Sequence, residues 1–364
     1  MTTPRPFQSL DEFIAKEVRD GSFPGAGIIV TGHGGRVLER SWGSYCSQTQ
    51  RLLPLDSSVS HMLYSFSKGI SATVIAVAHQ QGLVDYDAPV SAYIPEYRGG
   101  WKDGTTIRHL LTHAAGIPRV PLADVYTDES WRLGVAACCA APVEWQPGSK
   151  TEYHGLSGLF LAAACVRRVM RMASWEEICR EFLFAPLGAA SLTFRVPADP
   201  RLALTPQPSD LPCPIDTSRF SLLGHPGGGC FGRLEDVVKV LELHLRQGWH
   251  GGQQILRPEE AEEMRRVQYE EQIAQAQRSG KQPVHEPWGL GWLIRRDLAD
   301  HWFGFGQSTC QRAFGHAGID TVLGVADPER QVAAVFVTTN SPQPSGANVV
   351  RIRNRVTDLV IEGT

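Results

Sequence analysis

The sequence predicts an α+β fold, in which one antiparallel sheet is built from both ends of the chain and a mostly helical region is inserted. Strand-like segments lie near both termini, each beside an amphipathic helix. Between residues 62 and 245, most periodic segments instead have helical spacing. Elements segregated in this way are typical of a sheet with helices packed on it. We expect residues 1–60 and 225–364 to form the sheet domain and residues 61–224 the helical domain, with the active site between them.

The N-terminal elements are a helix and a hairpin. Ser9-x-x-Glu12 has the spacing of a capping box, which predicts the start of a helix. The apolar face of this helix consists of Leu10, Phe13, Ile14 and Val18. Residues 27–31 and 37–42 are strand-like, and the segment HGG at 33–35 supplies turn chemistry between them.

The middle of the chain is predominantly helical in its periodicity. The predicted helices span residues 68–81, 106–112, 157–170, 175–184 and 234–246. The proline-rich stretch 197–214 is predicted to be a surface loop. The charged stretch 264–282 is predicted to be an exposed helix followed by a loop.

The C-terminal end mirrors the N-terminal one. Residues 321–325 and 332–338 are strand-like, and Asp-Pro-Glu-Arg at 327–330 supplies the turn between them. A final helix is predicted from four apolar residues on one face, Val349, Ile352, Val356 and Val360.

Composition narrows the possible partners. The chain has 364 residues, of which 42% are hydrophobic, and a formal net charge of -3. This charge provides no basic field for nucleic acid, and no uninterrupted apolar stretch of about 18 residues predicts a membrane span. The N-terminus lacks the apolar run of a secretory signal, so a cytoplasmic protein is expected.

The eight cysteines include no C-x-x-C pair, so we expect buried reduced thiols and no metal. The triple glycine at 227–229 lacks the lysine of a phosphate loop, and no cofactor is expected.

The candidate nucleophile lies in residues 64–69, YSFSKG, which contain a Ser-x-x-Lys pair. Residues three apart share one face of a helix, so the Ser65 hydroxyl and the Lys68 amine can meet. Most isolated pairs of this kind are a capping serine and a solvated lysine. Here the following helix is apolar on most sides, which predicts that Lys68 is buried. Burial lowers the pKa of a lysine and makes it a possible base.

Two further segments carry candidate catalytic groups. Tyr153 follows WQPG at 145–148, and a tyrosine hydroxyl near a lysine can relay protons. An isolated tyrosine of this kind is more often a half-buried structural residue. The segment GHAG at 315–318 has glycines that let the backbone approach a ligand, so that an N–H group could face a developing oxyanion. Taken alone, this segment would be a turn.

In this order the three segments resemble those of the serine β-lactamase, DD-peptidase and family VIII carboxylesterase superfamily. The resemblance covers nearly the whole chain. Residues 106–117, TIRHLLTHAAGI, are similar to the superfamily segment TIRHLLTHTSGL, and residues 82–90, GLVDYDAPV, to GKLDLDDPV. Residues 186–188 and the glycines at 227–229 also fit. The resemblance implies a β-lactamase/transpeptidase-like fold.

The resemblance also assigns roles to individual positions. It implies that Ser65 is the acylated serine, that Lys68 is the lysine beside it and that Tyr153 is the tyrosine of the Y-x-N motif. The oxyanion hole would use the backbone N–H groups of Ser65 and Ile319. Whether Lys68 or Tyr153 takes the proton during acylation is left open by the sequence.

Two positions depart from the penicillin-recognising members of this superfamily. Gly155 stands where those relatives have asparagine, and His316 stands where they have lysine. The resemblance places both positions, with Gly318, among the substrate-binding residues. Because a histidine is mostly neutral near pH 7, it holds a β-lactam carboxylate less well than lysine does. His113 lies in the LLTH segment, and we expect it to pack rather than act as a base.

The leading hypothesis is therefore a serine hydrolase with an acyl-enzyme on Ser65, acting as a carboxylesterase on small acyl esters or as an acyltransferase. The enzymatic alternatives are a D-amino-acid amidase or aminopeptidase and a weak β-lactamase. A catalytically silent binding or scaffold protein is an alternative of another class, disfavoured because Ser65, Lys68 and Tyr153 are all retained. The expected partner is a small-molecule ester or amide. The sequence contains no G-x-S-x-G motif, which argues against an α/β-hydrolase.

Overall fold

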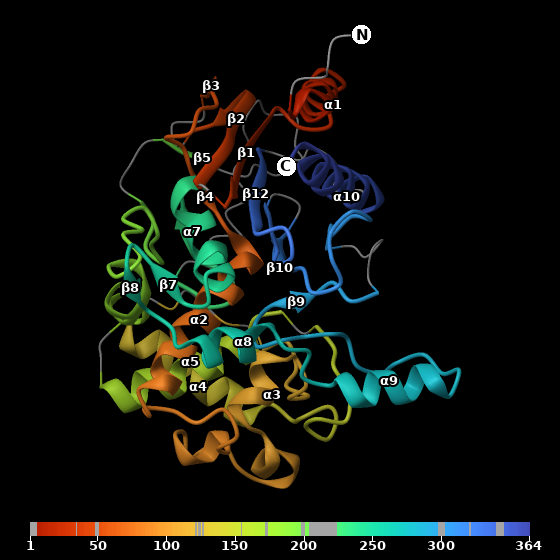
Figure 1. Ribbon diagram of the computed structural model, residues 1–364. Coiled ribbons are helices and arrows are strands. Elements are labelled where there is room, and N and C mark those ends of the chain that lie inside the picture. The colour runs from red at the N-terminus through yellow and green to blue at the C-terminus, as the bar shows by residue number, and fades with distance from the viewer. Residues whose placement is uncertain are drawn as a thin grey trace.

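The centre of the molecule is a seven-stranded antiparallel sheet with the strand order β3-β2-β1-β12-β11-β10-β9 (Figure 1). The structure is a computed structural model that describes residues 6–33, 35–47, 51–120, 122, 125, 127–153, 155–171, 174–197, 201–203, 224–297, 303–319, 322–339 and 346–364. The strands are β1 (Gly25–Gly32), β2 (Gly35–Cys46), β3 (Leu52–Pro54), β9 (Leu293–Ile294), β10 (Phe314–Gly318), β11 (Val322–Asp327) and β12 (Val332–Thr339).

The two ends of the chain meet in the middle of this sheet. Strand β1 pairs with β12 along its length, with Ile28 opposite Phe336 and Gly25 opposite Thr339. On its other side, β1 pairs with β2 in the N-terminal hairpin, and β12 pairs with β11 in the C-terminal hairpin. The predicted sheet from both termini is therefore confirmed.

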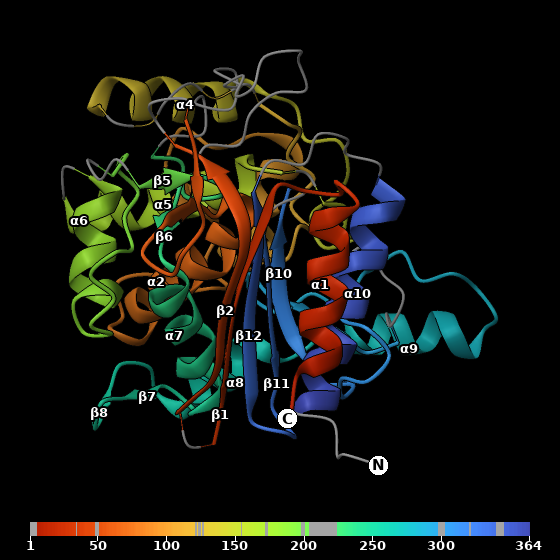
Figure 2. The same cartoon turned by 90° about the horizontal axis from the view of Figure 1, so that it is seen from above.

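Both faces of the sheet are covered, and the alternation of side chains along β12 shows how. Ala334 and Phe336 belong to the apolar cluster shared with the terminal helices, α1 (Gln8–Arg19) and α10 (Gly346–Gly363). Val335 and Val337 belong to the core of the helical region on the other face. Figure 2 shows α1 and α10 side by side on one face of the sheet and α7 (Leu234–Leu245) on the other. A central strand buried on both faces reads as a continuous apolar run, as β12 does.

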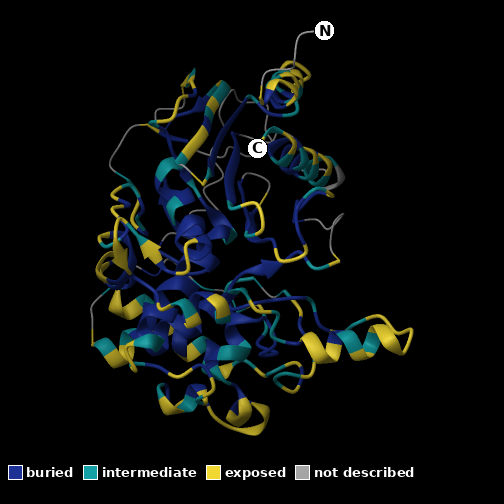
Figure 3. Cartoon of the chain, in the orientation of Figure 1, coloured by how far each residue is buried: buried dark blue, intermediate teal, exposed yellow. Residues whose placement is uncertain are grey.

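The inserted helical region surrounds one buried helix. Helix α2 (Ser67–Gln80) is buried at every position from Ser67 to Ala78, and Figure 3 shows it inside the molecule. The other helices are α3 (Ile107–Leu111), α4 (Asp128–Ala140), α5 (Ser157–Met170), α6 (Trp175–Cys179), α8 (Pro258–Arg265) and the exposed α9 (Glu270–Arg278). Helical turns also occur at η1 (Tyr64–Phe66), η2 (Val90–Ala92), η3 (Gly100–Gly104) and η4 (Arg180–Phe184).

Two small sheets complete the described structure. Strand β4 (Ser60–Met62) lies between β5 (Leu202–Ala203) and β6 (Phe231–Gly232), and β7 (Trp249–His250) pairs with β8 (Gln253–Gln254). Within the stretch 197–214, residues 198–200 and 204–214 lie outside the described residues. Leu202 and Ala203 are a buried strand, so the prediction of a surface loop is wrong at these two residues.

Two local predictions need correction. The segment 315–318, which taken alone would be a turn, lies in β10 and pairs with β11. The capping box at Ser9 is wrong, because α1 already begins at Gln8 and Phe7 before it makes no side-chain cap. Cys46 is disulfide-bonded, so the expectation of reduced thiols fails at that position.

In the part of the chain that the structure describes, each helix is either too short or too polar to cross a bilayer.

Candidate active site

Ser65 lies in the short helical turn η1, directly before the buried helix α2. The preceding residue, Tyr64, has a φ of 47°, a left-handed conformation that non-glycine residues seldom adopt. Strand β10 lies against this turn. A Cβ atom on Gly318 would come within 2.6 Å of the Leu63 carbonyl oxygen, so only glycine permits the approach. The turn therefore holds Ser65 beside the end of β10.

Lys68 lies one turn further along, with its amine beside the serine. Its Nζ donates hydrogen bonds to Ser65 Oγ and to the carbonyl oxygen of Gly227, both at 2.9 Å. The side chain is completely buried, and this burial lowers the pKa of Lys68 from 10.5 to about 7. An amine with this pKa is present in substantial amounts as the neutral base at neutral pH.

Tyr153 reaches the same serine from a different part of the chain. Its hydroxyl donates a hydrogen bond of 2.7 Å to Ser65 Oγ. The Lys68 Nζ lies 5.0 Å from the centre of the tyrosine ring. Burial raises the pKa of Tyr153, while the hydrogen bond to Ser65 and the charge of Arg119 oppose this rise. The phenol form is therefore favoured over the phenolate.

An aromatic cluster fixes the ring of Tyr153. Trp288 stacks on it at 5.9 Å between ring centres, and His113 packs against both rings at 4.7 and 4.6 Å. The backbone N–H of Glu152 also donates to the carbonyl oxygen of His113. The packing role predicted for His113 thus includes contact with the candidate catalytic tyrosine. Sequence reasoning missed Trp288, whose only signal was the segment WGLGW at 288–292.

The glycine-rich segment 225–230 supplies the carbonyl that Lys68 uses. Helix α2 holds this segment at three points. Ser71 Oγ donates to the carbonyl oxygen of Pro226 at 2.7 Å, Lys68 bonds Gly227, and the N–H of Cys230 donates to Ser67 Oγ at 3.1 Å. The buried amine is therefore held between its own helix and a segment far along the chain.

A cavity of about 480 Å³ opens in front of Ser65. It is lined by Tyr64, Ser65, Arg119, Val120, Tyr153, Gly155, Leu156, Ser157, Gly228, Ala317, Gly318, Ile319 and Arg353. Of the residues predicted to form the site, Ser65, Tyr153, Gly155, Gly318 and Ile319 therefore share one cavity wall. Ile319 follows β10 and is 53% exposed, beside the serine turn.

The structure places His316 differently from a residue that touches substrate. Its side chain is fully buried and does not line the cavity, although Ala317 beside it does. Its Nδ1 lies 2.9 Å from the Ala317 carbonyl oxygen, and its ring packs on Phe303 and Tyr153. Burial first, and the charge of Lys68 second, lower the pKa of His316 well below 6.5. His316 is therefore a neutral group behind the cavity wall. From this position its side chain does not contact a substrate carboxylate in the cavity.

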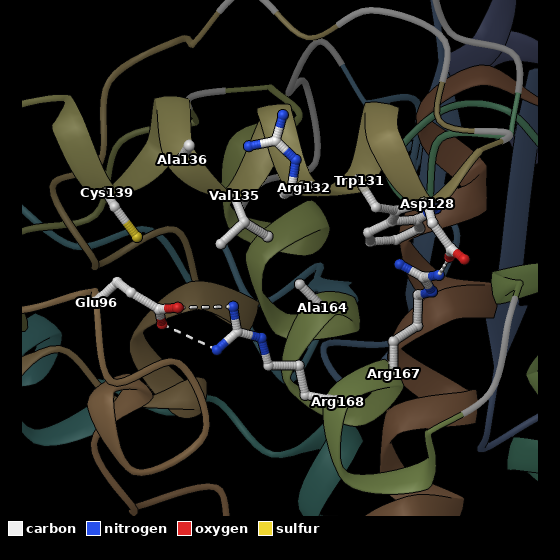
Figure 4. A pocket seen from close by; sticks show the side chains of 10 residues that line it. All are labelled: Glu96, Asp128, Trp131, Arg132, Val135, Ala136, Cys139, Ala164, Arg167 and Arg168. Carbon is white, nitrogen blue, oxygen red and sulfur yellow. Dashed lines mark hydrogen bonds and ion pairs between the residues drawn. The ribbon is translucent and has the colours of Figure 1, made fainter.

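A second cavity, of about 560 Å³, lies between α4 and α5. Figure 4 shows that charged side chains within it pair with each other, Arg168 with Glu96 and Arg167 with Asp128. It is lined by none of the predicted catalytic residues. The candidate active site is therefore the smaller cavity.

Comparison with known proteins agrees with this geometry. The sequence pattern of the family described as Beta-lactamase matches residues 10–357. The chain belongs to the β-lactamase family of serine hydrolases. Among curated proteins, this family member is similar to a β-lactamase of Providencia stuartii, with 22% identity over 242 residues, and to Esterase EstB of Burkholderia gladioli, with 25% identity over 281 residues. These matches cover 66% and 64% of this chain, and 60% and 68% of those proteins.

Solved structures of the β-lactamase family share the architecture over the whole chain. One is a family VIII carboxylesterase with a TM-score of 0.71 and 25% identity, and the match covers 98% of this chain and 99% of that one.

Proposed function

We propose that this β-lactamase-family chain is a carboxylesterase that cleaves small acyl esters through an acyl-enzyme on Ser65. The observation that carries the proposal is the convergence of Lys68 Nζ at 2.9 Å and Tyr153 Oη at 2.7 Å on one serine oxygen. A nucleophile with two proton-transfer groups at hydrogen-bond distance is the arrangement that acyl transfer needs. The same acyl-enzyme can pass its acyl group to an alcohol instead of water, so acyltransferase activity belongs to the same proposal.

The pKa directions favour Lys68 as the base during acylation. Lys68 has a pKa of about 7, whereas burial raises the pKa of Tyr153. In the proposed step, Ser65 Oγ bonds to the ester carbonyl carbon while its proton passes to neutral Lys68. Tyr153 then gives a proton to the departing alkoxide and is reprotonated from Lys68, so that the charges balance. The backbone N–H groups of Ser65 and Ile319 would stabilise the oxyanion.

Two features favour esters over β-lactams. Penicillin-recognising relatives use a lysine and an asparagine where this chain has His316 and Gly155. His316 is neutral and buried, and Gly155 has no side chain. A β-lactam therefore finds neither partner at these positions. The similarity to EstB and to a family VIII carboxylesterase supports the same choice.

Replacement of the nucleophile tests the proposal directly. The Ser65→Ala variant should lose hydrolysis of p-nitrophenyl butyrate by several orders of magnitude while keeping its circular dichroism spectrum. A fluorophosphonate should label the peptide that contains Ser65 in the wild type, as read by mass spectrometry. A label on Ser157, which lines the same cavity, would contradict the assignment. A panel of esters, D-amino-acid amides and a chromogenic cephalosporin then ranks the substrate classes.

A further inference from the structure

Arg119 lines the candidate active site and has no hydrogen-bond or ion-pair partner among the residues that the structure describes. It lines the same cavity as Ser65, and its side chain is exposed. Among the described residues it makes no hydrogen bond or ion pair, and its one recorded interaction is electrostatic, with Tyr153. Other described arginines, such as Arg167 and Arg168, are neutralised by ion pairs with carboxylates. Arg119 thus presents a full positive charge to the cavity.

The backbone on both sides of Arg119 is fixed to the cavity wall. The hydroxyl of Ser157 donates to the carbonyl oxygen of Pro118 at 2.8 Å and accepts from the N–H of Val120 at 3.0 Å. Ser157 itself lines the cavity at the start of α5. One hydroxyl therefore bonds the residue before Arg119 and the residue after it. This holds the base of the arginine side chain in place and leaves its guanidinium available.

The charge balance of the cavity strengthens this observation. No aspartate or glutamate occurs among the described residues that line it. Its other arginine, Arg353, is buried and donates to the carbonyl oxygens of Gly318 and Val322. The rest of the wall is largely apolar, with Val120, Leu156 and Ile319. A guanidinium in such surroundings is less screened than one in bulk water and prefers a planar anion such as a carboxylate.

We propose that Arg119 is a specificity-determining residue, which selects ester substrates that carry a carboxylate on the acyl or the alkoxy group. This inference rests on the proposed esterase function and names its substrate class. It also accounts for the loss of lysine at position 316, because the cation that faces a substrate anion lies in a different part of the wall.

The test compares charged and neutral esters in matched variants. Wild type, Arg119→Gln, Arg119→Lys and Arg119→Glu are assayed with p-nitrophenyl butyrate, p-nitrophenyl hemiglutarate and 4-carboxyphenyl butyrate. In Arg119→Gln, kcat/KM for at least one carboxylate ester should fall about tenfold to a hundredfold relative to the neutral ester, the usual range for a charge-assisted hydrogen bond. Arg119→Lys should recover part of the ratio, and Arg119→Glu should lower it further. Added salt should weaken the wild-type preference.

Arg132→Gln is the matched control. It removes the same charge from an exposed arginine that lines only the other cavity, so the ratio should stay at the wild-type value. A ratio that is the same in wild type, Arg119→Gln and Arg119→Glu for both carboxylate esters would overturn the proposal. An equal fall in Arg132→Gln would also overturn it, because the effect would then come from net charge alone.

A binding measurement separates this inference from the esterase proposal. Calorimetry of each carboxylate ester, p-nitrophenyl hemiglutarate and 4-carboxyphenyl butyrate, with Ser65→Ala and with Ser65→Ala combined with Arg119→Gln measures recognition without turnover. Weaker binding of at least one ester to the double variant supports the role of Arg119 even if the wild type hydrolyses none of the three esters, which would refute only the esterase proposal. Equal binding of both carboxylate esters to the two proteins rejects the role of Arg119.

Discussion

At the scale of single residues, Lys68 has the environment that differs most from that of an ordinary lysine. Its amine is fully buried, and its two hydrogen-bond partners, Ser65 Oγ and the Gly227 carbonyl oxygen, are both neutral. A buried ammonium without a carboxylate partner is costly, which is why burial moves the pKa toward the neutral amine. The burial of the Lys68 amine thus both lowers the stability of the fold and provides the basicity that catalysis needs.

The first consequence concerns the dependence of rate on pH. We expect kcat/KM for p-nitrophenyl butyrate to rise with pH through an apparent pKa near 7, because only neutral Lys68 can accept the proton of Ser65. Steady-state assays between pH 5 and 9 measure this profile. Burial holds the pKa of His316 well below 6.5, so His316 should not titrate near pH 7. A profile that is flat from pH 5.5 to 8.5 would exclude Lys68 as the base.

The second consequence concerns stability. The folded chain loses the Lys68 proton near pH 7, whereas the unfolded chain keeps it up to about pH 10.5. Between these values the unfolded state binds more protons, so the contribution of Lys68 to the free energy of unfolding rises with pH. Lys68→Met removes this rise. Measured by urea unfolding, the free energy of unfolding of the variant should exceed that of wild type by more at pH 6.5 than at pH 9.5. An equal difference at both pH values would contradict this.

The sequence predicted which catalytic candidates lie together, but it did not predict the burial of His316 or the place of Arg119 in the cavity. Ser65, Lys68 and Tyr153 lie together, as the motif order implied, because their spacing and their motifs carry the chemistry. The burial of His316 could not be read from the sequence, since it depends on which side of β10 faces the cavity and on Phe303 packing behind it. Arg119 lies in no catalytic motif, and only the cavity wall reveals it.

At the scale of elements, the close approach of β10 to the serine turn makes a sharp prediction. A Cβ atom on Gly318 would lie 2.6 Å from the Leu63 carbonyl oxygen and 3.1 Å from Tyr64 Cβ. Gly318→Ala should therefore displace the turn or the strand and lower kcat by about a hundredfold, as a displacement near 1 Å can do. The assay is steady-state hydrolysis of p-nitrophenyl butyrate, with fluorophosphonate labelling to report the nucleophile.

Gly155→Asn is the contrasting substitution in the same cavity. Gly155 has a φ of 79° and open space where a Cβ would stand, and asparagine tolerates this conformation better than most residues. We expect a loss of about 1–2 kcal/mol in the free energy of unfolding, at the lower end of the cost of a left-handed residue, together with a larger change in KM than in kcat. A drop in kcat as large as that of Gly318→Ala would show that the two positions do not differ in the predicted way.

Periodicity predicted the strongly apolar elements and failed where other interactions decide. Helix α5 has the predicted bounds, 157–170, because it is apolar on most of its surface. Helix α4 was not predicted, since only a narrow stripe containing Trp131, Val135 and Cys138 is buried. Strand β10, FGHAG, has no β-branched residue and is a strand because β11 and β9 pair with it.

At the scale of the whole molecule, the helix α10 is bonded to β10, the strand that lies beside Ser65. Arg353 on α10 is buried and donates to the carbonyl oxygens of Gly318 and Val322, at the ends of β10 and β11. Replacement by methionine leaves these buried carbonyls without this donor, and each such group costs about 1–3 kcal/mol. We expect Arg353→Met to lower the urea midpoint and also kcat. Arg355→Met on the same helix should lower neither by a comparable amount, because Arg355 and its ion-pair partner Glu362 are both exposed.

The domain division at residues 60 and 225 stays a prediction. Sequence alone could place the strands at both ends of the chain but not their register, which depends on packing across the sheet. Both faces of β12 are buried, so its apolar run at residues 332–337 carries no alternation that would show which side faces the helical region.

The pairing of β1 with β12 has a consequence for how the protein is made. Gly25 can pair with Gly43 early, but its second partner, Thr339, lies 314 residues further along the chain and is made much later. Until then the nascent chain carries an N-terminal hairpin whose inner edge has no neighbour, and such edges are prone to aggregate. Contacts between residues so distant in the chain also close slowly. The order of synthesis thus makes the completion of the sheet a late step, and β10, a strand of the same sheet, can lie beside Ser65 only after residues 314–318 have been made.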